Sequence, residues 1–211
     1  RLVGSEMCIR DRSLLIQPPV YADFSKTRWM ELRDGLEQLK EIKLYTYNAP
    51  HAACAYAGYL KGYKTILEAS ADPEIAALQD EVLKEAIPGL SKEFGIPEEE
   101  IWAFCSLPRT KEEMDDSIYR VAVDPIRKLS RNDRLTGNAM FCFKHGIDPK
   151  ALIKSIANGM AYDEPRDEKA MLIQNMIREE GIEAAIAKVC GVSADHDLVT
   201  RVAAEYKTIK G

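Results

Sequence analysis

Apolar residues recur along this chain at alternating spacings of three and four, which is the period of an amphipathic helix. Trp29, Leu32, Leu36 and Leu39 form one such seam, and the next position in the series is Lys43. The pattern therefore predicts a helix through this stretch that carries a lysine on its apolar face.

Helix start and stop signals punctuate most of the remaining chain. Aspartate followed by proline predicts an N-cap with a first-turn proline, and glycine after a polar residue predicts a helix end. Expected helix starts lie at Asp72, Pro97, Thr110, Asp124, Ser130, Asp148 and Ser193, and expected ends lie at Gly146, Gly181 and Gly191.

Strand signals are weak. Residues 14–21 are apolar, but Pro18 and Pro19 exclude a central strand there. We therefore predict an all-α chain, helical from about residue 17 to residue 211, with no linker or repeat that divides it. The sequence shows no GxGxxG turn and no Walker loop, so it predicts no complete dinucleotide or ATP site. Residues 1–12 look like non-native sequence, which places the expected start of the protein proper near Ser13.

Composition narrows the function classes. The 211 residues carry a formal net charge of -5 with a pI of about 5.4, so neither nucleic acid nor a membrane is an expected partner. The five cysteines show no CxxC spacing, which indicates thiols in a reducing cytoplasm. No apolar run approaches a membrane span, and no histidine has metal-ligand spacing. We expect a soluble cytoplasmic protein without a metal, and its oligomeric state, monomer or dimer, stays open.

The candidate chemistry lies in KLYTYNAPHAACAYAGYLKGY, residues 43–63. On a continuous helix, His51 would lie about 80° and Asn48 about 140° from Lys43, so the three would share less than half of the circumference. Pro50 would kink that helix, or break it with Asn48 as the N-cap of a new one. Either geometry can turn the three polar side chains towards one site.

These three residues suit proton exchange with an alcohol. A desolvated lysine has a lowered pKa and can take up or release such a proton near neutral pH. Asn48 and His51 can then donate hydrogen bonds to the oxygen that gains charge. Each residue also has a structural interpretation, in which Asn48 is a helix cap, His51 bonds a backbone carbonyl in the core and Lys43 extends to water.

Four cations follow closely in the sequence: Arg127, Lys128, Arg131 and Arg134. On one helix the three arginines would share a face, and a helix that starts after Ser130 would add free N–H groups. Both arrangements suit a phosphate group. The alternative is a solvated basic face in which Asp133 pairs with a neighbouring arginine.

Two motifs carry a family resemblance. The pattern KxxxxNxxH followed by AxAYxGYxxGY resembles the catalytic segment of the polyol-specific long-chain dehydrogenases, the mannitol dehydrogenase family. DPIRKLSRNDRLTGNA, residues 124–139, is similar to the RKLSxxDRL segment of members that act on mannitol 1-phosphate. The segment that begins at His145 is similar to their later helices, and the resemblance covers roughly residues 28–208.

The resemblance implies a multihelical domain of the 6-phosphogluconate dehydrogenase C-terminal-like type, without the N-terminal Rossmann domain that holds most of the NAD. It implies Lys43 as general acid/base, Asn48 and His51 as groups that polarise the reacting oxygen, and the four cations as a phosphate site. The implied reaction interconverts mannitol 1-phosphate and fructose 6-phosphate with NAD and no metal, and this fragment alone is expected to be inactive.

Two alternatives remain open. An unphosphorylated polyol or a hexuronate is the alternative substrate, because LPRTKEEMDD stands where the mannitol 1-phosphate enzymes carry an RFxN-type stretch. A helical interaction module without catalysis is the alternative from another class.

Overall fold

The computed structural model describes residues 14–16, 30–32, 36–105 and 116–211. The chain divides into two compact units, Arg1–Lys43 (unit 1) and Leu44–Gly211 (unit 2). Helix α1, Leu36–Thr46, contains the division between them. The predicted chain start near Ser13 and the predicted cap at Thr110 lie outside the described residues.

Unit 1 contains two short strands, β1 (Leu14–Ile16) and β2 (Met30–Leu32), paired in parallel. The helical seam predicted from Trp29 is therefore wrong at its start, because helix α1 begins only at Leu36. Apolar positions of a strand and of the following helix happened to fall at helical spacing, and periodicity alone cannot separate such short runs.

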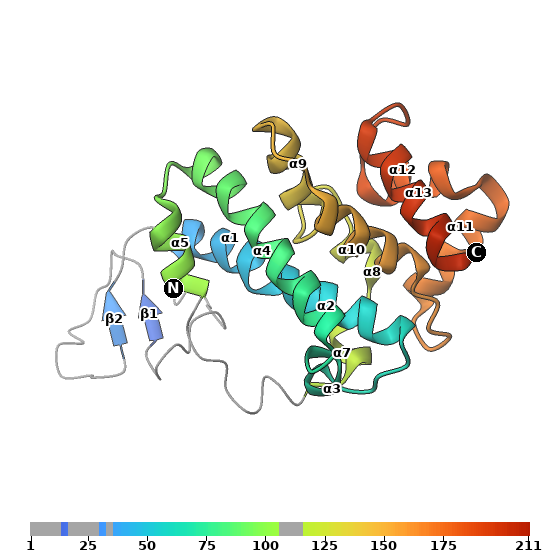
Figure 1. The fold of residues 1–211 in the computed structure, drawn as a ribbon, viewed down its shortest axis with the longest axis horizontal. Coiled ribbons are helices and arrows are strands. Elements are labelled where there is room, and N and C mark those ends of the chain that lie inside the picture. Colours follow the sequence, from blue (N-terminus) through green and yellow to red (C-terminus); the bar gives the residue numbers. More distant parts are fainter. Residues whose placement is uncertain (1–13, 17–29, 33–35, 106–115) are drawn as a thin grey trace. The chain divides into compact units, whose positions relative to one another are not determined.

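The described secondary structure of unit 2 is helical, as predicted, apart from one isolated bridge between Thr65 and Ser117 (Figure 1). Its helices are α2 (Asn48–Leu60), α3 (Ile66–Ser70), α4 (Pro73–Phe94), α5 (Glu98–Cys105), α7 (Ile118–Ala122), α8 (Pro125–Lys128), α9 (Thr136–Lys144), α10 (Lys150–Ala161), α11 (Glu168–Glu180), α12 (Ile182–Cys190) and α13 (Asp197–Lys210).

Two of the three aspartate–proline signals, at Asp72 and Asp124, mark true N-caps. At Asp148 the prediction is wrong by one residue, because Pro149 is the N-cap and α10 begins at Lys150. The carboxylate of Asp72 accepts hydrogen bonds from the backbone N–H groups of Glu74 and Ile75, at 2.8 and 3.3 Å. Asp124 caps α8 in the left-handed region, with φ 63°. Such a φ disfavours most side chains, and aspartate is among the few that tolerate it.

The serine signals were wrong. Helix α9 begins at Thr136, six residues after Ser130, and helix α13 begins at Asp197. His196 caps α13 instead of Ser193, because its Nδ1 accepts the N–H of Leu198 at 3.1 Å. A serine is compatible with many turns, so the signal is weaker than that of an aspartate followed by proline.

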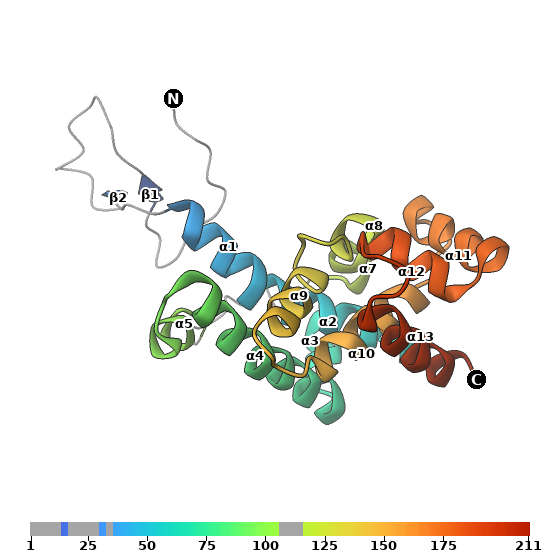
Figure 2. The same ribbon diagram turned by 90° about the horizontal axis from the view of Figure 1, so that it is seen from above.

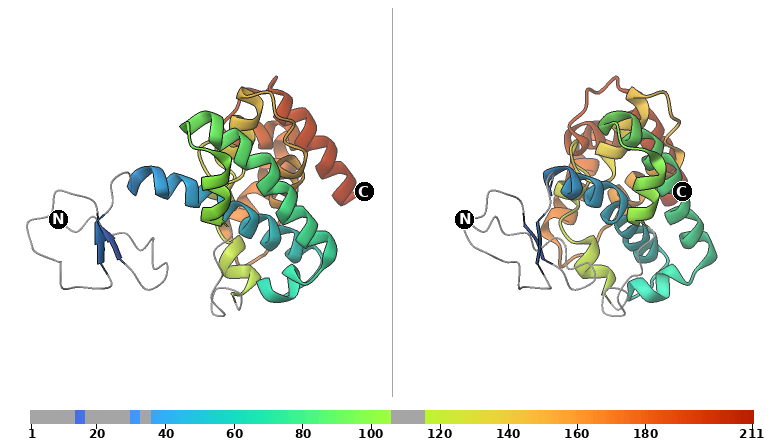
Figure 3. Two further views of the ribbon diagram at one scale, coloured as in Figure 1. Left: turned by 60° about the vertical axis from the view of Figure 1, so that its left-hand side comes forward. Right: turned by 90° about the vertical axis from the view of Figure 1, so that its left-hand side faces the viewer.

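Helix α2 lies in the middle of unit 2 and packs against α3, α4, α7 and α10. Its buried face is rich in alanine, and Ala49, Ala52, Ala53 and Ala55 are fully buried. Such small side chains let the neighbouring helices approach closely. Figure 2 shows α11, α12 and α13 together at the C-terminal end, and Figure 3 shows the long α4 along the outside of unit 2.

Tyrosines of α2 fill the core, as their helical spacing indicated. Tyr56 is fully buried, and its hydroxyl donates to the carbonyl of Ala122 at 3.1 Å. The ring of Tyr162 packs against Tyr56 and Tyr59, with centroids 5.6 and 4.5 Å apart.

Burial raises the pKa of the Cys142 and Cys190 thiols to about 12, so both are poorly reactive. No described helix is long and apolar enough to cross a membrane.

Two glycines provide a matched test of this packing. A Cβ at Gly58 would lie 2.7 Å from Cβ of Ala69, whereas a Cβ at Gly89 would find its nearest neighbours at 3.6 Å. We expect Gly58→Ala to lower the free energy of unfolding by about 1–3 kcal/mol through overpacking. We expect Gly89→Ala to raise it by up to about 1 kcal/mol, because alanine favours the helix. Urea unfolding followed by circular dichroism measures both, and equal effects would contradict the close packing of α2 on α3.

Candidate active site

The candidate site begins at the junction of α1 and α2. Only Tyr47 separates the two helices, and it keeps right-handed helical dihedrals of φ -98° and ψ -50°. Pro50 has no N–H to donate to the carbonyl of Thr46, so the helix cannot run through unbroken. Tyr47, not Asn48, occupies the N-cap position, and it makes no side-chain capping bond. Asn48 is thus the first helical residue, and the interpretation of Asn48 as a cap is wrong.

The three predicted catalytic residues are all half-buried. Lys43 lies in the last turn of α1 and is the last residue of unit 1, whereas Asn48 and His51 lie in the first turn of α2, in unit 2. Asn48 and His51 stand three residues apart on this helix and therefore lie on the same face.

His51 faces a carboxylate from a distant part of the sequence. Its Nε2 lies 4.0 Å from Oδ2 of Asp116, and the two side chains are 13% and 18% exposed. Its ring also stacks with that of Tyr47, with centroids 6.2 Å apart. The imidazole is thus held between an aromatic ring and an acidic group.

The predicted cation cluster does not lie on one helix. Helix α8 ends at Lys128 and α9 begins at Thr136, so the expectation that the arginines share a helix face is wrong. Fully buried Leu129 and Leu135 anchor the intervening loop at both ends. The Thr136 hydroxyl donates to the Leu129 carbonyl at 2.7 Å, which holds the loop closed.

Two of the arginines converge on Asp133. Nε of Arg134 lies 2.7 Å from one carboxylate oxygen of Asp133, and a terminal nitrogen of Arg127 lies 3.4 Å from the other. Arg131 instead donates to the carbonyl of Gly191 at 3.4 Å. Arg127 and Arg134 therefore form the cationic pair of the loop, with Asp133 between them.

Lys128 is a buried amine. Its Nζ donates to the backbone carbonyls of Val121, at 2.7 Å, and of Val123. Burial, reinforced by the nearby Arg134 and Arg127, lowers the pKa of Lys128 to about 8. The amine satisfies carbonyls at the C-terminal end of α7, where a helix favours a cation.

The loop between Leu129 and Leu135, which contains Arg131 and Arg134, is hydrogen-bonded to the α1–α2 junction. The side-chain amide of Asn138 donates to the carbonyls of both Tyr45 and Arg134 at 2.8 Å, and the Tyr45 hydroxyl donates to the Asn132 carbonyl at 3.0 Å. We call this set of bonds the Tyr45–Asn138 clasp. It lies within unit 2 and brings the segment just before Asn48 alongside the cationic pair. Nothing in the sequence pattern singled out Tyr45 or Asn138.

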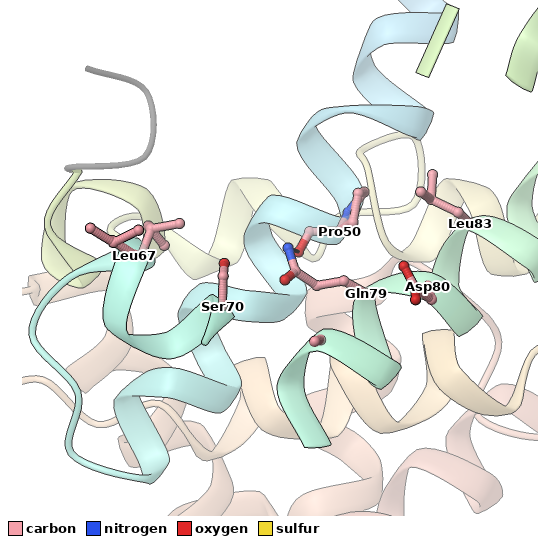
Figure 4. Close-up of a pocket in the computed structure, with 8 residues that line it drawn as sticks. Pro50, Leu67, Ser70, Gln79, Asp80 and Leu83 are labelled. Atoms are coloured by element: carbon pink, nitrogen blue, oxygen red, sulfur yellow. Dashed lines mark hydrogen bonds between the residues drawn. The ribbon is translucent and has the colours of Figure 1, made fainter. Parts of the chain in front are cut away.

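A separate pocket of about 160 Å³ opens between α2, α3 and α4 (Figure 4). Its wall is mostly apolar, with Ser70, Gln79 and Asp80 as polar members. The side chain of Gln79 points towards Pro50 and donates to its carbonyl at 3.2 Å, which ties the start of α2 to α4. Neither Asn48 nor His51 lines this pocket. Within the described ranges, no three His, Cys, Asp or Glu side chains gather as a metal site requires.

Comparisons with known proteins place these features in context. Residues 35–210 match the family described as the mannitol dehydrogenase C-terminal domain. The mannitol-1-phosphate 5-dehydrogenase of Thermoanaerobacter pseudethanolicus is 38% identical over 183 residues, which cover 85% of this chain and 47% of that enzyme. The same-named enzyme of Clostridium acetobutylicum is 37% identical over 183 residues, covering 85% of this chain and 48% of that enzyme. The chain thus spans about half the length of the curated relatives it matches.

Solved structures share the fold. Pseudomonas fluorescens mannitol 2-dehydrogenase, in a ternary complex with NAD and D-mannitol, matches with a TM-score of 0.65 and 17% identity. The match covers 88% of this chain and 41% of that one. A D-sorbitol dehydrogenase in substrate-free form matches with a TM-score of 0.63 and 18% identity, covering 86% of this chain and 40% of that one.

The buried amine of Lys128 makes stability depend on alkaline pH. At Lys128 the folded chain binds fewer protons than the unfolded chain between the lowered pKa of about 8 and the ordinary value of 10.5. The free energy of unfolding of the wild type should therefore rise across this window by about 3 kcal/mol relative to that of Lys128→Met. Urea unfolding of both proteins at several pH values measures the difference. Lys150→Met removes an amine whose side chain is 80% exposed, and this control should keep the wild-type slope; a similar slope in Lys128→Met would contradict the burial.

Proposed function

The chain belongs to the mannitol dehydrogenase C-terminal domain family, and we propose that it supplies the substrate-side groups of a polyol dehydrogenase that interconverts mannitol 1-phosphate and fructose 6-phosphate with NAD. The observation that carries this proposal is the Tyr45–Asn138 clasp, which sets a cationic pair beside the segment that leads to Asn48 and His51. Asn48, His51 and the groups proposed for an anion thus all belong to unit 2, whereas Lys43 is the last residue of unit 1.

In this proposal Lys43 exchanges the proton of the reacting hydroxyl. During oxidation its neutral amine accepts that proton, and during reduction its ammonium returns a proton to the oxygen. The role of Lys43 rests on the KxxxxNxxH motif and on its half-buried position in the last turn of α1. Asn48 and His51 donate hydrogen bonds to the same oxygen and stabilise its partial charge as the carbonyl forms.

The described residues do not fit a dinucleotide site. A dinucleotide fold needs a parallel sheet of several strands with a glycine-rich turn before a helix, and the described strands of this chain are the three-residue β1 and β2. We therefore assign most of the NAD contacts to a Rossmann domain outside this chain, and we assign to the chain itself only proton exchange and substrate orientation. The two solved neighbours are named as dehydrogenases, and each of their chains is more than twice as long as the region that matches this chain.

The phosphate would meet Arg127 first. The side chain of Arg127 is 55% exposed, whereas that of Arg134 is 12% exposed and bonded to Asp133. Planar guanidinium groups suit the oxygens of a phosphate. Arg131 would contribute a longer-range charge, and Lys128 would support the loop from inside rather than touch the ligand.

An unphosphorylated polyol is the second candidate, because Asp133 already neutralises part of the cationic pair. Its carboxylate accepts hydrogen bonds from both arginines. A neutral hexitol needs no anion site, and hydroxyl groups could use the same donors and acceptors.

Lys43→Arg tests the proton role. Arginine keeps the positive charge but cannot release a proton near neutral pH, so we expect kcat for mannitol 1-phosphate oxidation to fall by about 10²- to 10⁴-fold. The assay uses the complete protein that contains this chain, with NADH formation followed by absorbance. Lys84→Arg, in an exposed residue of α4, is the control and should keep the wild-type rate. An undiminished rate in Lys43→Arg would favour a non-catalytic helical module.

Arg127→Glu tests the phosphate. Loss of a charge-assisted bond should raise KM for mannitol 1-phosphate by about 10- to 100-fold, while KM for mannitol should change little. Arg166→Glu reverses an exposed charge elsewhere on unit 2, and it should leave both KM values near those of the wild type. Equal effects of Arg127→Glu on the two substrates would favour the unphosphorylated polyol.

A further inference from the structure

We propose that Asp116 is a positioning residue for His51 and that Arg120 fixes the carboxylate in that role. The contact between Asp116 and His51 follows from the structure, and only its catalytic consequence rests on the proposed function. The two residues are 65 positions apart in the sequence, and no motif of the chain joins them.

The imidazole and the carboxylate face each other in a sheltered place. Nε2 of His51 lies 4.0 Å from Oδ2 of Asp116, and both side chains are less than one-fifth exposed. Reduced exposure strengthens the attraction between a carboxylate and a protonated imidazole. The carboxylate therefore favours a proton on Nε2 and limits rotation of the ring, whose face is stacked on Tyr47.

The backbone from Asp116 onwards is held by hydrogen bonds. Its carbonyl accepts the N–H of Ile66 at 2.8 Å, and the N–H of Ile118 donates to the carbonyl of Lys64 at 2.9 Å. Ser117 between them caps helix α7, since its hydroxyl accepts the N–H of Arg120 at 3.2 Å. The backbone that carries the Asp116 side chain is thus paired at its carbonyl and at the two residues that follow.

Arg120 holds both oxygens of the Asp116 carboxylate. Its Nε donates to Oδ1 of Asp116 at 2.7 Å, and its terminal NH2 group contacts Oδ2. This two-pronged contact fixes the carboxylate plane. Because the guanidinium also shares Oδ2 with His51, its positive charge weakens the pull of Asp116 on the imidazole. On the other side of the α2 start, Asp80 of α4 lines the pocket next to Pro50 and is a second acidic group of this region.

The arrangement gives His51 a defined donor direction. In the proposed reaction, a ring that rotates freely would present its N–H to the reacting oxygen only part of the time. A ring held between Asp116 and Tyr47 keeps its orientation, so the stabilisation of the oxygen needs no rearrangement during the reaction. Asp116 acts through His51 and need not touch the substrate.

Imidazole NMR of this chain tests the contact without reference to activity. The chain has three histidines, so the signal of His51 is identified by its loss in His51→Gln. We expect Asp116→Asn to lower the pKa of His51 by about 1, because an opposite charge is removed. We expect Arg120→Gln to raise it, because a like charge is removed while the carboxylate stays. His196, which caps α13, is the internal control and should titrate alike in all variants.

The two variants give opposite signs, which a general loss of structure would not produce. If Asp116→Asn unfolds the chain, Arg120→Gln decides alone, since the Arg120 side chain is 69% exposed and its removal leaves the backbone bonds of Asp116 in place. An unchanged or lowered pKa of His51 in Arg120→Gln, or an unchanged pKa in folded Asp116→Asn, overturns the proposal.

Kinetics then test the consequence. In the complete protein we expect Asp116→Ala to lower kcat by about tenfold or more with little change in KM, and Asp116→Glu to recover part of the rate. His51→Gln should lower kcat at least as much. A normal rate in His51→Gln would contradict the proposed function and leave the NMR result valid. A low rate in His51→Gln with a normal rate in Asp116→Ala would contradict the positioning role alone.

Discussion

The structure of the candidate site depends on one missing hydrogen bond. Pro50 cannot donate to the carbonyl of Thr46, so the chain must change direction between α1 and α2. On either side of this bend, neighbouring residues bond to different elements. Tyr45 joins the clasp with α9, the Pro50 carbonyl accepts from α4, and His51 faces Asp116 before α7. Tyr45, Pro50 and His51 thus tie the end of α1 and the start of α2 to three different parts of unit 2.

Polar residues hold both ends of the short helix α7, which lies next to the residue that faces His51. At its N-terminal end Ser117 caps the helix, and Asp116 reaches His51. At its C-terminal end Lys128 donates to the carbonyls of Val121 and Val123. An ammonium inside a protein requires such partners, since an unpaired buried charge would be far less favourable. Lys128 therefore fixes the far end of α7, the helix that follows Asp116.

The sequence predicted those helix starts that depend only on neighbouring residues. Aspartate followed by proline restricts the backbone over two or three residues, so Asp72 and Asp124 marked true helix starts. Ser130 failed because buried leucines and a threonine bond determine the course of its loop, and those contacts form only in the folded chain. The pairing of His51 with Asp116 was likewise out of reach, because no periodic pattern links residues so far apart. The three residues Lys43, Asn48 and His51 could be grouped from the sequence alone, since they lie within nine residues of one another along the chain.

The balance of charge around Asp133 bears directly on the choice of substrate. The guanidinium groups of Arg127 and Arg134 face the carboxylates of Asp133 and Asp124, so the charges there nearly cancel, whereas a phosphate monoester carries between one and two negative charges near neutral pH. A phosphate would therefore have to share Arg127 with Asp124 and Asp133, or displace one of them. Arg134 has little freedom to do so, because it is largely buried and its Nε lies 2.7 Å from Asp133. In the proposed function, discrimination between a phosphorylated and a free hexitol would therefore depend chiefly on Arg127, whose side chain is 55% exposed and can leave its acidic partners more easily than that of Arg134.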